Sequence, residues 1–194
     1  MTGMMPPELW LLVGGNGSGK STFYETFLAK HRIPLVNADN IARSLWPDQP
    51  EQHSYEAALI AEKERYRLLE ERQTFCFETV FSHPSKLDFV GEAKAAGYVI
   101  KVFYFHLATP ELNVARVSCR VISGGHNVPE AKLRGRIPRT VNLVRDCVGL
   151  ADELHLIDNS SADHPYKRLA VLQQGEWLRF ADDVPEWINA FTDH

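Results

Sequence analysis

Residues 14–21 constrain the fold of this chain more than any other segment. They match the phosphate-binding loop pattern G-x-x-x-x-G-K-[ST], and the apolar run 9–13 comes directly before them. The pattern binds phosphate where a strand leads into the loop and a helix leaves it, because backbone N–H groups then converge on an anion at the start of the helix. We therefore predict strand, loop and helix in that order, and a nucleoside triphosphate site.

The loop supplies the predicted nucleotide-binding residues. The Lys20 ammonium can reach the β- and γ-phosphates, and the Ser21 hydroxyl can ligate Mg²⁺. We accordingly expect ATP and Mg²⁺ as cofactors. The predicted nucleotide site comprises Gly14, Gly15, Asn16, Gly17, Ser18, Gly19, Lys20, Ser21 and Thr22.

Length and charge narrow the class of protein. A chain of 194 residues, 44% of them hydrophobic, is enough for one well-buried core, so we expect a single domain over residues 1–194. The net charge is −4 and no long basic run is present, which disfavours nucleic acid and anionic lipid as partners. The apolar run 9–13 is too short for a signal peptide core, and no stretch approaches the length that spans a membrane. We expect a cytoplasmic protein that binds small anions.

The three cysteines do not predict a metal site or a disulfide. Cys76, Cys119 and Cys147 lack metal-ligand spacing and have largely apolar neighbours. We expect buried free thiols.

Helical and extended segments alternate along the chain. We expect strands over 9–13, 33–38, 75–80, 98–105 and 153–158, a hairpin over 166–172 and 176–180, and a short last helix from Pro185. Helices are expected over 20–30, 54–72, from 82–84 to 97, 110–120 and 129–148. This order predicts an α/β fold of three layers, a parallel sheet of the P-loop NTPase and nucleoside-kinase type with flanking helices and a C-terminal hairpin.

The helix expected over 54–72 carries apolar or aromatic groups along one face. The residues of this face are Tyr55, Ala58, Leu59, Tyr66 and Leu69. We expect this face to be buried.

Two acidic residues are expected near the triphosphate. Asp39 ends the expected second strand, and Glu78 lies near the carboxyl end of the third. Ligands of open α/β sheets collect beyond those strand ends. Asp39 is the predicted base for an acceptor hydroxyl, with a helix N-cap before Asn40 as the alternative. Glu78, followed by Thr79, is predicted to position the acceptor or hold Mg²⁺ through water, with an exposed strand-end charge as the alternative.

Arginines gather around a second glycine-containing loop. A lid segment is predicted around residues 120–140, with hinges at Gly124 and Gly125. Guanidinium groups match phosphate oxygens well. Arg120 and Arg136 are the predicted phosphate contacts, and a solvated helical face paired with glutamates is the alternative. The full arginine set is Arg116, Arg120, Arg134, Arg136 and Arg139.

Two other classes of phosphate-loop protein are less well supported. Asp158 could serve as the carboxylate of an ABC-type ATPase, but Asn159 stands where a glutamate is usual, and the Leu-Ser-Gly-Gly-Gln signature is absent. A GTP-dependent switch would need an Asn-Lys-x-Asp motif, which is also absent.

The order of these parts resembles the zeta-toxin family of bacterial phosphate-loop kinases, including short single-domain members. The resemblance rests on residues 14–22, 37–39 and 78–86, on the stretch 124–129 and on the arginines after Pro110. It implies a nucleotide-binding lysine at Lys20, a catalytic aspartate at Asp39, an acidic substrate residue at Glu78 and a phosphate-contacting arginine at Arg120, with Arg136 inferred from its position.

The same resemblance implies a reaction and a partner. The reaction is ATP-dependent phosphorylation of a hydroxyl of a UDP-activated amino sugar, UDP-N-acetylglucosamine. A kinase of another small metabolite or nucleotide, or an ATPase without an acceptor, is the alternative. The implied partner is a small antitoxin encoded as a separate chain.

Overall fold

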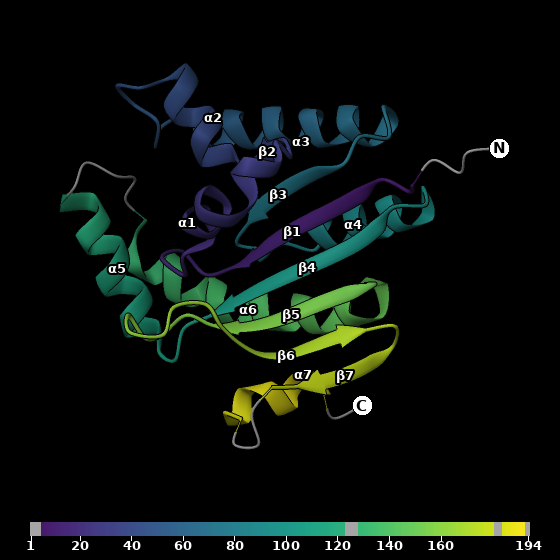
Figure 1. Ribbon diagram of the computed structural model, residues 1–194. Helices are drawn as coiled ribbons and strands as arrows, with labels where there is room; N and C mark the ends of the chain where they lie inside the picture. The colour runs from purple at the N-terminus through teal and green to yellow at the C-terminus, as the bar shows by residue number, and fades with distance from the viewer. Residues whose placement is uncertain (1–4, 123–127, 181–183, 193–194) are drawn as a thin grey trace.

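The computed structural model describes residues 5–122, 128–180 and 184–192, and Figure 1 shows a twisted sheet with helices on both faces. The strands are β1 (Glu8–Gly14), β2 (Leu35–Val36), β3 (Phe75–Thr79), β4 (Val99–His106), β5 (Glu153–Asp158), β6 (Lys167–Gln173) and β7 (Glu176–Arg179). The α-helices are α1 (Lys20–Phe23), α2 (Ala38–Leu45), α3 (Ser54–Glu70), α4 (Ser85–Ala95), α5 (Pro110–Ile122), α6 (Glu130–Cys147) and α7 (Asn189–Thr192). Shorter helical turns are η1 (Tyr24–Leu28), η2 (Ala29–His31), η3 (Val148–Leu150) and η4 (Glu186–Ile188).

The described strands form one sheet in the order β2-β3-β1-β4-β5-β6-β7. The first five in this order are parallel, whereas β6 and β7 add as an antiparallel hairpin. This confirms the predicted three-layer α/β fold and its C-terminal hairpin. Because β3 lies between β1 and β2, their carboxyl ends meet at the edge of the sheet where the phosphate loop begins.

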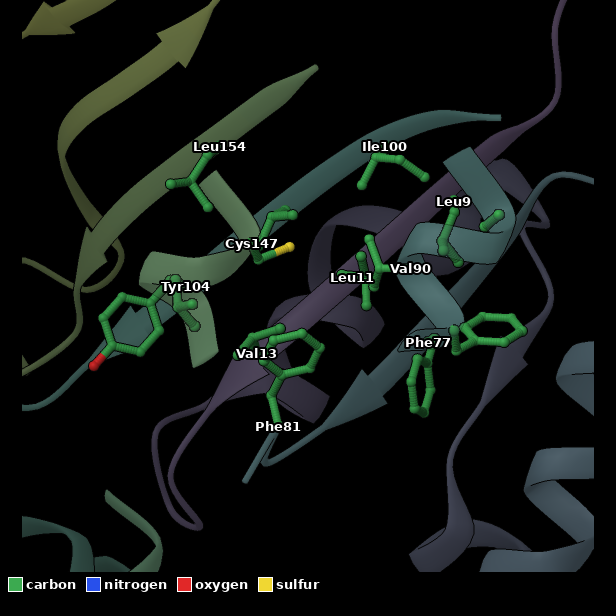
Figure 2. Packing of buried hydrophobic residues seen from close by; sticks show 14 of the residues in the cluster. Leu9, Leu11, Val13, Phe77, Phe81, Val90, Ile100, Tyr104, Cys147 and Leu154 are labelled. Carbon is green, nitrogen blue, oxygen red and sulfur yellow. The ribbon is translucent and has the colours of Figure 1, made fainter. Parts of the chain in front are cut away.

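Apolar residues of β1 point toward both faces of the sheet, so the sequence of this strand is a continuous hydrophobic run. Figure 2 shows Leu9, Leu11 and Val13 on the face that packs against Val90 of α4 and Cys147 of α6. The residues between them face the other way, where Leu12 packs with Leu28 and Phe105 in a second cluster under α1 and η1. The strand that enters the phosphate loop is therefore anchored from both sides.

Two predicted elements differ from the structure around the site. The second strand is confined to Leu35–Val36, because Asn37 already caps α2, a helix that the sequence did not predict. The helix after the loop is α-helical only to Phe23 and continues as a π-helical turn and a 3₁₀ turn to His31.

The buried face of α3 is rotated from the predicted one. Tyr55 is 72% exposed and Leu59 is 43% exposed, so the predicted face is only partly correct. The buried residues of α3 are Ala57, Ala61, Arg65 and Leu68. Figure 1 shows α2 and α3 along the β2–β3 edge of the sheet, where this face packs inward.

The cysteine prediction is correct for two residues. Cys76 and Cys147 are buried free thiols, and burial raises the pKa of Cys147 to about 12. Cys119 lies on the exposed side of α5, so its predicted burial is wrong.

Within the described ranges, no helix combines the length and the apolar character needed to cross a bilayer.

Candidate active site

A cavity of about 990 Å³ opens at the carboxyl ends of β1 and β3. Its walls come from the phosphate loop, α2, α3, the start of α4, α5 and α6. Among the predicted site residues, the cavity is lined by Asn16, Gly17, Gly19, Lys20, Ser21, Thr22, Asp39, Glu78, Thr79, Arg120 and Arg136. Gly14, Gly15 and Ser18 do not line it and lie in the supporting part of the loop.

The Lys20 side chain lies under the loop. Its ammonium Nζ donates to the carbonyl oxygens of Gly14 at 2.8 Å and Gly15 at 2.9 Å, and the residue is only 6% exposed. An ammonium group has three donors, so one remains for a ligand oxygen. A buried cation at the base of a glycine-rich loop is suited to an anion such as a phosphate.

Charged groups from four elements surround this ammonium. Burial lowers the pKa of Lys20, two carboxylates oppose that shift, and two guanidinium groups add to it. The four charged groups are Glu78, Asp39, Arg120 and Arg136. All the predicted charged site residues are thus electrostatic neighbours of Lys20.

Neighbouring side chains hold the loop in shape. Asn113 donates from Nδ2 to the carbonyl of Asn16 at 2.7 Å, and Asn159 donates from Nδ2 to the carbonyl of Ser18 at 2.9 Å. Gly19 has a φ of 96°, and a Cβ there would lie 2.4 Å from Nδ2 of Asn159. This position therefore requires glycine. Asn159, directly after β5, therefore supports the loop.

Asp39 lies in the first turn of α2, so it does not end a strand as predicted. The cap of this helix is Asn37, whose Oδ1 accepts from the backbone N–H groups of Asp39 at 2.7 Å and Asn40 at 3.2 Å. The capping alternative for the Asp39 carboxylate is therefore wrong. Its half-buried side chain lines the cavity instead.

Glu78 lies beside the loop because β3 and β1 are in register, with Glu78 opposite Leu12. Its Oε1 accepts a hydrogen bond from the Ser21 hydroxyl at 2.7 Å. The other carboxylate oxygen, Oε2, is buried and has no hydrogen-bond partner among the described residues. The alternative of an exposed strand-end charge is therefore wrong.

The arginine cluster divides into two groups. Arg116 and Arg120 of α5 and Arg136 of α6 line the cavity, and Nη1 of Arg136 contacts Oδ1 of Asn16 at 3.5 Å. Burial lowers the pKa of Arg136, and the Asp39 carboxylate opposes this shift.

The remaining two arginines face away from the cavity. Arg134 pairs with Glu111 at 2.6 Å and Glu130 at 2.7 Å on the surface, and Arg139 bonds to the carbonyl of Gly135. The predicted hinge at Gly124 and Gly125 lies outside the described residues.

Four basic residues of the cavity wall were not among the site residues predicted from the sequence. They are Arg43, Arg65, Lys86 and Lys132. A signal existed for Arg65, because it follows Ala57 and Ala61 at intervals of four on a helix and thus falls on their face. The other three stand on segments whose approach to the loop is set by the tertiary fold.

The donor set fits a triphosphate with Mg²⁺. The free donor of Lys20 and the guanidinium groups of Arg120 and Arg136 suit phosphate oxygens. The Ser21 hydroxyl beside a carboxylate fits Mg²⁺, which takes one or two protein oxygens together with phosphates and water. No group of three or more His, Cys, Asp or Glu residues suited to a metal occurs among the described residues.

Known structures share this fold. A solved structure of AvrRxo1-ORF1:-ORF2 with ATP has a TM-score of 0.71 and 15% identity over 90% of this chain, which spans only 60% of that chain. The PezAT toxin-antitoxin system of Streptococcus pneumoniae gives a TM-score of 0.60 and 14% identity, over 85% of this chain and 72% of that one. Shikimate kinase of Acinetobacter baumannii is also among the similar structures, with a TM-score of 0.50 and 18% identity over 80% of this chain and 86% of that one. The chain therefore has a kinase-like P-loop fold.

Sequence comparison finds one curated relative and one family model. An uncharacterised protein of Haemophilus influenzae is 28% identical over 134 residues, which cover 66% of this chain and 95% of that protein. A family model described as an AAA domain matches residues 9–137, from β1 into α6 and across the phosphate loop. Because this match covers well over half of the chain, the protein belongs to that AAA domain family.

Proposed function

We propose that this protein is a phosphotransferase that moves the γ-phosphoryl group of ATP to a hydroxyl of a small anionic metabolite. One observation carries the proposal: two carboxylates, Asp39 and Glu78, share a cavity and an electrostatic environment with the loop lysine, Lys20. A nucleotide-binding module needs the lysine, whereas an acceptor hydroxyl needs a base and a group that orients it.

The proposed reaction has one displacement step. The acceptor oxygen attacks the γ-phosphorus, the bond from that phosphorus to the β–γ bridging oxygen breaks, and ADP leaves. The hydroxyl proton goes to the Asp39 carboxylate. The Glu78 carboxylate accepts a hydrogen bond from a second hydroxyl of the acceptor and so orients the attacking one, while its Oε1 keeps the hydrogen bond from Ser21. Thr79, next to Glu78, lines the same wall.

Positive charge from the protein neutralises the transferring group. Lys20 contacts the β- and γ-phosphates, and Arg120 and Arg136 contact the γ-phosphate from α5 and α6. Mg²⁺ bound at Ser21 would supply further neutralisation of the phosphate oxygens. The segment around residues 120–140 carries both arginines and is our proposed lid.

The proposed acceptor is a nucleotide-activated sugar such as UDP-N-acetylglucosamine, in the cytoplasm. The resemblance of residues 14–22, 37–39 and 78–86 to zeta toxins supports this choice. The fold is also similar to that of the PezAT toxin-antitoxin system, in keeping with a toxin-like protein. The volume of the cavity, about 990 Å³, is at the upper end of the range typical of small-molecule sites and can hold a triphosphate with an acceptor beside it.

Mass spectrometry tests the proposal. The protein is incubated with ATP, Mg²⁺ and UDP-N-acetylglucosamine, and in parallel with a metabolite extract, with the Lys20→Ala variant as the blank. We expect a product heavier by one phosphoryl group in the wild-type reactions alone. Release of inorganic phosphate without any such product contradicts the proposal and indicates an ATPase.

We further propose that a separate partner protein binds this chain. The support is that the similar structures of AvrRxo1-ORF1 and of PezAT contain partner proteins. The AvrRxo1 structure holds ATP together with the partner, so we expect the partner to bind the ATP-saturated protein as well. Purification of the tagged chain from its host should recover the partner in a fixed ratio, and recovery of the chain alone contradicts the proposal.

A further inference from the structure

A second group of positive charges lines the cavity, and the phosphate loop does not use it. Arg65 of α3 is 2% exposed, and its guanidinium carbon lies 4.2 Å from the ring centre of Phe77 and 5.1 Å from that of Phe89. The two rings hold the guanidinium in one place against the cavity wall. Arg65 is therefore positioned before any ligand arrives.

The protein provides little compensation for this buried charge. The nearest carboxylate belongs to Glu62, which is half exposed and 3.9 Å from Nη2 of Arg65. Nε of Arg65 is buried and has no hydrogen-bond partner among the described residues. A buried guanidinium group is costly unless its donors are paired. The missing acceptor is thus expected from a ligand.

Lys86 joins Arg65 at the same wall. It lies in the first turn of α4, is half-buried and lines the cavity. Burial lowers the pKa of Lys86, and the positive charge of Arg65 lowers it further. Lys86 and the buried guanidinium group of Arg65 are thus neighbouring cations at one wall of the cavity, an arrangement that suits an anion.

The strand β3 connects this pair to the proposed reaction centre. Phe77, on which Arg65 rests, directly precedes Glu78, which is bonded to Ser21 at the phosphate loop. The pair and the loop thus line one cavity, with the carboxylates of Asp39 and Glu78 beside the loop. We call the part of the wall at the loop the nucleotide end and the part at Arg65 and Lys86 the acceptor end.

We propose that Arg65 and Lys86 form a second anion subsite, which binds a phosphate or diphosphate group of the acceptor. This role rests on the proposed function, because it assigns the group to the molecule that receives the phosphoryl group. Two cations, one of them a planar fork of donors, match a doubly charged phosphate better than a singly charged carboxylate. The subsite would select phosphorylated acceptors over neutral sugars or alcohols.

Inorganic phosphate is the probe for this subsite. The full chain is saturated with Mg²⁺ and a non-hydrolysable ATP analogue, which fills the phosphate loop. Its melting temperature is then followed against phosphate concentration at constant ionic strength, with acetate as the contrasting anion. We expect the melting temperature to rise with phosphate concentration until the site is saturated, and to rise much less with acetate.

Three variants locate the binding. Lys86→Gln should weaken phosphate at least about tenfold, since it removes a charged donor. Lys63→Gln, which removes a charge from the exposed side of α3, should change the affinity less than about twofold. Arg65→Lys keeps the charge but loses the fork, so we expect a loss between these two. Its melting temperature in chloride checks that the variant is folded.

The outcomes separate the two proposals. No phosphate binding to the loaded wild type, an equal effect of acetate, or unchanged affinity in Lys86→Gln overturns the subsite. If phosphate binding depends on Lys86 but the mass assay finds no phosphoryl transfer, the subsite proposal stands and the proposed kinase function is contradicted. If transfer occurs and the KM for the acceptor is unchanged in Lys86→Gln, the kinase function stands and the subsite proposal is contradicted.

Discussion

The two ends of the cavity are built differently. At the nucleotide end, Lys20, Asn113 and Asn159 hold the loop through hydrogen bonds to backbone carbonyls, and the loop residues are contiguous in the chain. At the acceptor end, Arg65 and Lys86 come from separate helices and have few protein partners. The protein's own hydrogen bonds fix the shape of the loop at the first end, whereas in our proposal the second end depends on a ligand to supply acceptors for Arg65.

This difference suggests that the nucleotide end determines which cofactor binds and that the acceptor end determines which substrate binds. A loop fixed by its own backbone serves any triphosphate, so it indicates nucleotide binding and little else. Charged side chains without partners are specific to one arrangement of ligand charge. Substitutions at the two ends should therefore change different measurements.

The largest effect is expected from Asp39→Asn, between the two ends. It removes the proposed base and keeps the side-chain shape, so phosphoryl transfer should fall about 10²- to 10⁴-fold. ATP affinity should change by less than about threefold, because no phosphate contact is lost. Single-turnover kinetics and calorimetry measure the two quantities.

Asp48→Asn is the matched control for this substitution, since Asp48 is exposed and does not line the cavity. It should leave transfer unchanged. Transfer by Asp39→Asn at the wild-type rate would remove Asp39 from the reaction.

Lys20→Ala should act on the nucleotide end. Loss of a buried charged donor weakens ATP binding about 10- to 100-fold, and turnover falls with it. Lys30→Ala, at an exposed position of the same helical segment, is the control and should retain affinity. Wild-type ATP affinity in Lys20→Ala would contradict the assignment of the loop.

A pair of glycine substitutions tests whether the loop is rigid. Gly19→Ala places a Cβ 2.4 Å from Asn159 at a φ of 96°, so the free energy of unfolding should drop by about 1–3 kcal/mol, with loss of ATP binding. Gly91→Ala on α4 meets nothing within 4 Å and should stabilise the protein by about 0.5–1 kcal/mol. Denaturant unfolding measures both. A loop that accepts alanine at residue 19 without loss would not be held as described.

The smallest effect is a pH dependence that comes from the sheet behind the loop rather than from the cavity. Burial lowers the pKa of His106 and of His155, against the opposing charges of Asp158 and Glu153. Their folded-state pKa values lie below the unfolded value near 6.5, so the unfolded chain takes up protons first as the pH falls. The contribution of these histidines to the free energy of unfolding is fully present above about pH 6.5. It decreases below that pH, by at most about 1.4 kcal/mol per pH unit for each histidine.

His106→Gln should flatten this decrease below pH 6.5, and His31→Gln, at an exposed position, should not. Melting curves between pH 7.5 and 5 measure it. Stability that rises as the pH falls over this range would contradict the burial of these histidines.

Much of the nucleotide end could be predicted from the sequence, because one contiguous motif between a strand and a helix encodes it. The positions of Asp39 and Glu78 beside the loop could also be anticipated, since parallel strands end at one edge. The sequence does not predict the helix cap at Asn37, because the extended pattern continues to residue 38. It does not predict the burial of Arg65, because the apolar pattern indicates a face of α3 that is shifted by one residue from the buried one.

The acceptor end could not be assembled from the sequence for a physical reason. Arg65 and Lys86 are 21 positions apart in the chain and belong to different helices. Only the packing of these helices against β3 brings the two residues together. Arg65 has one local signal, its position on the same helix face as Ala57 and Ala61, but the sequence around Lys86 does not distinguish it from an ordinary surface charge.

A crystal structure with Mg²⁺, a non-hydrolysable ATP analogue and the acceptor tests the central claim most directly. The account predicts the γ-phosphate against Lys20 and the Asp39 carboxylate across from it. The gap between them should be about 5–6 Å, enough for one hydroxyl oxygen in hydrogen-bond and attack distance. A γ-phosphate bound elsewhere, or an Asp39 carboxylate turned away from it, would contradict the account.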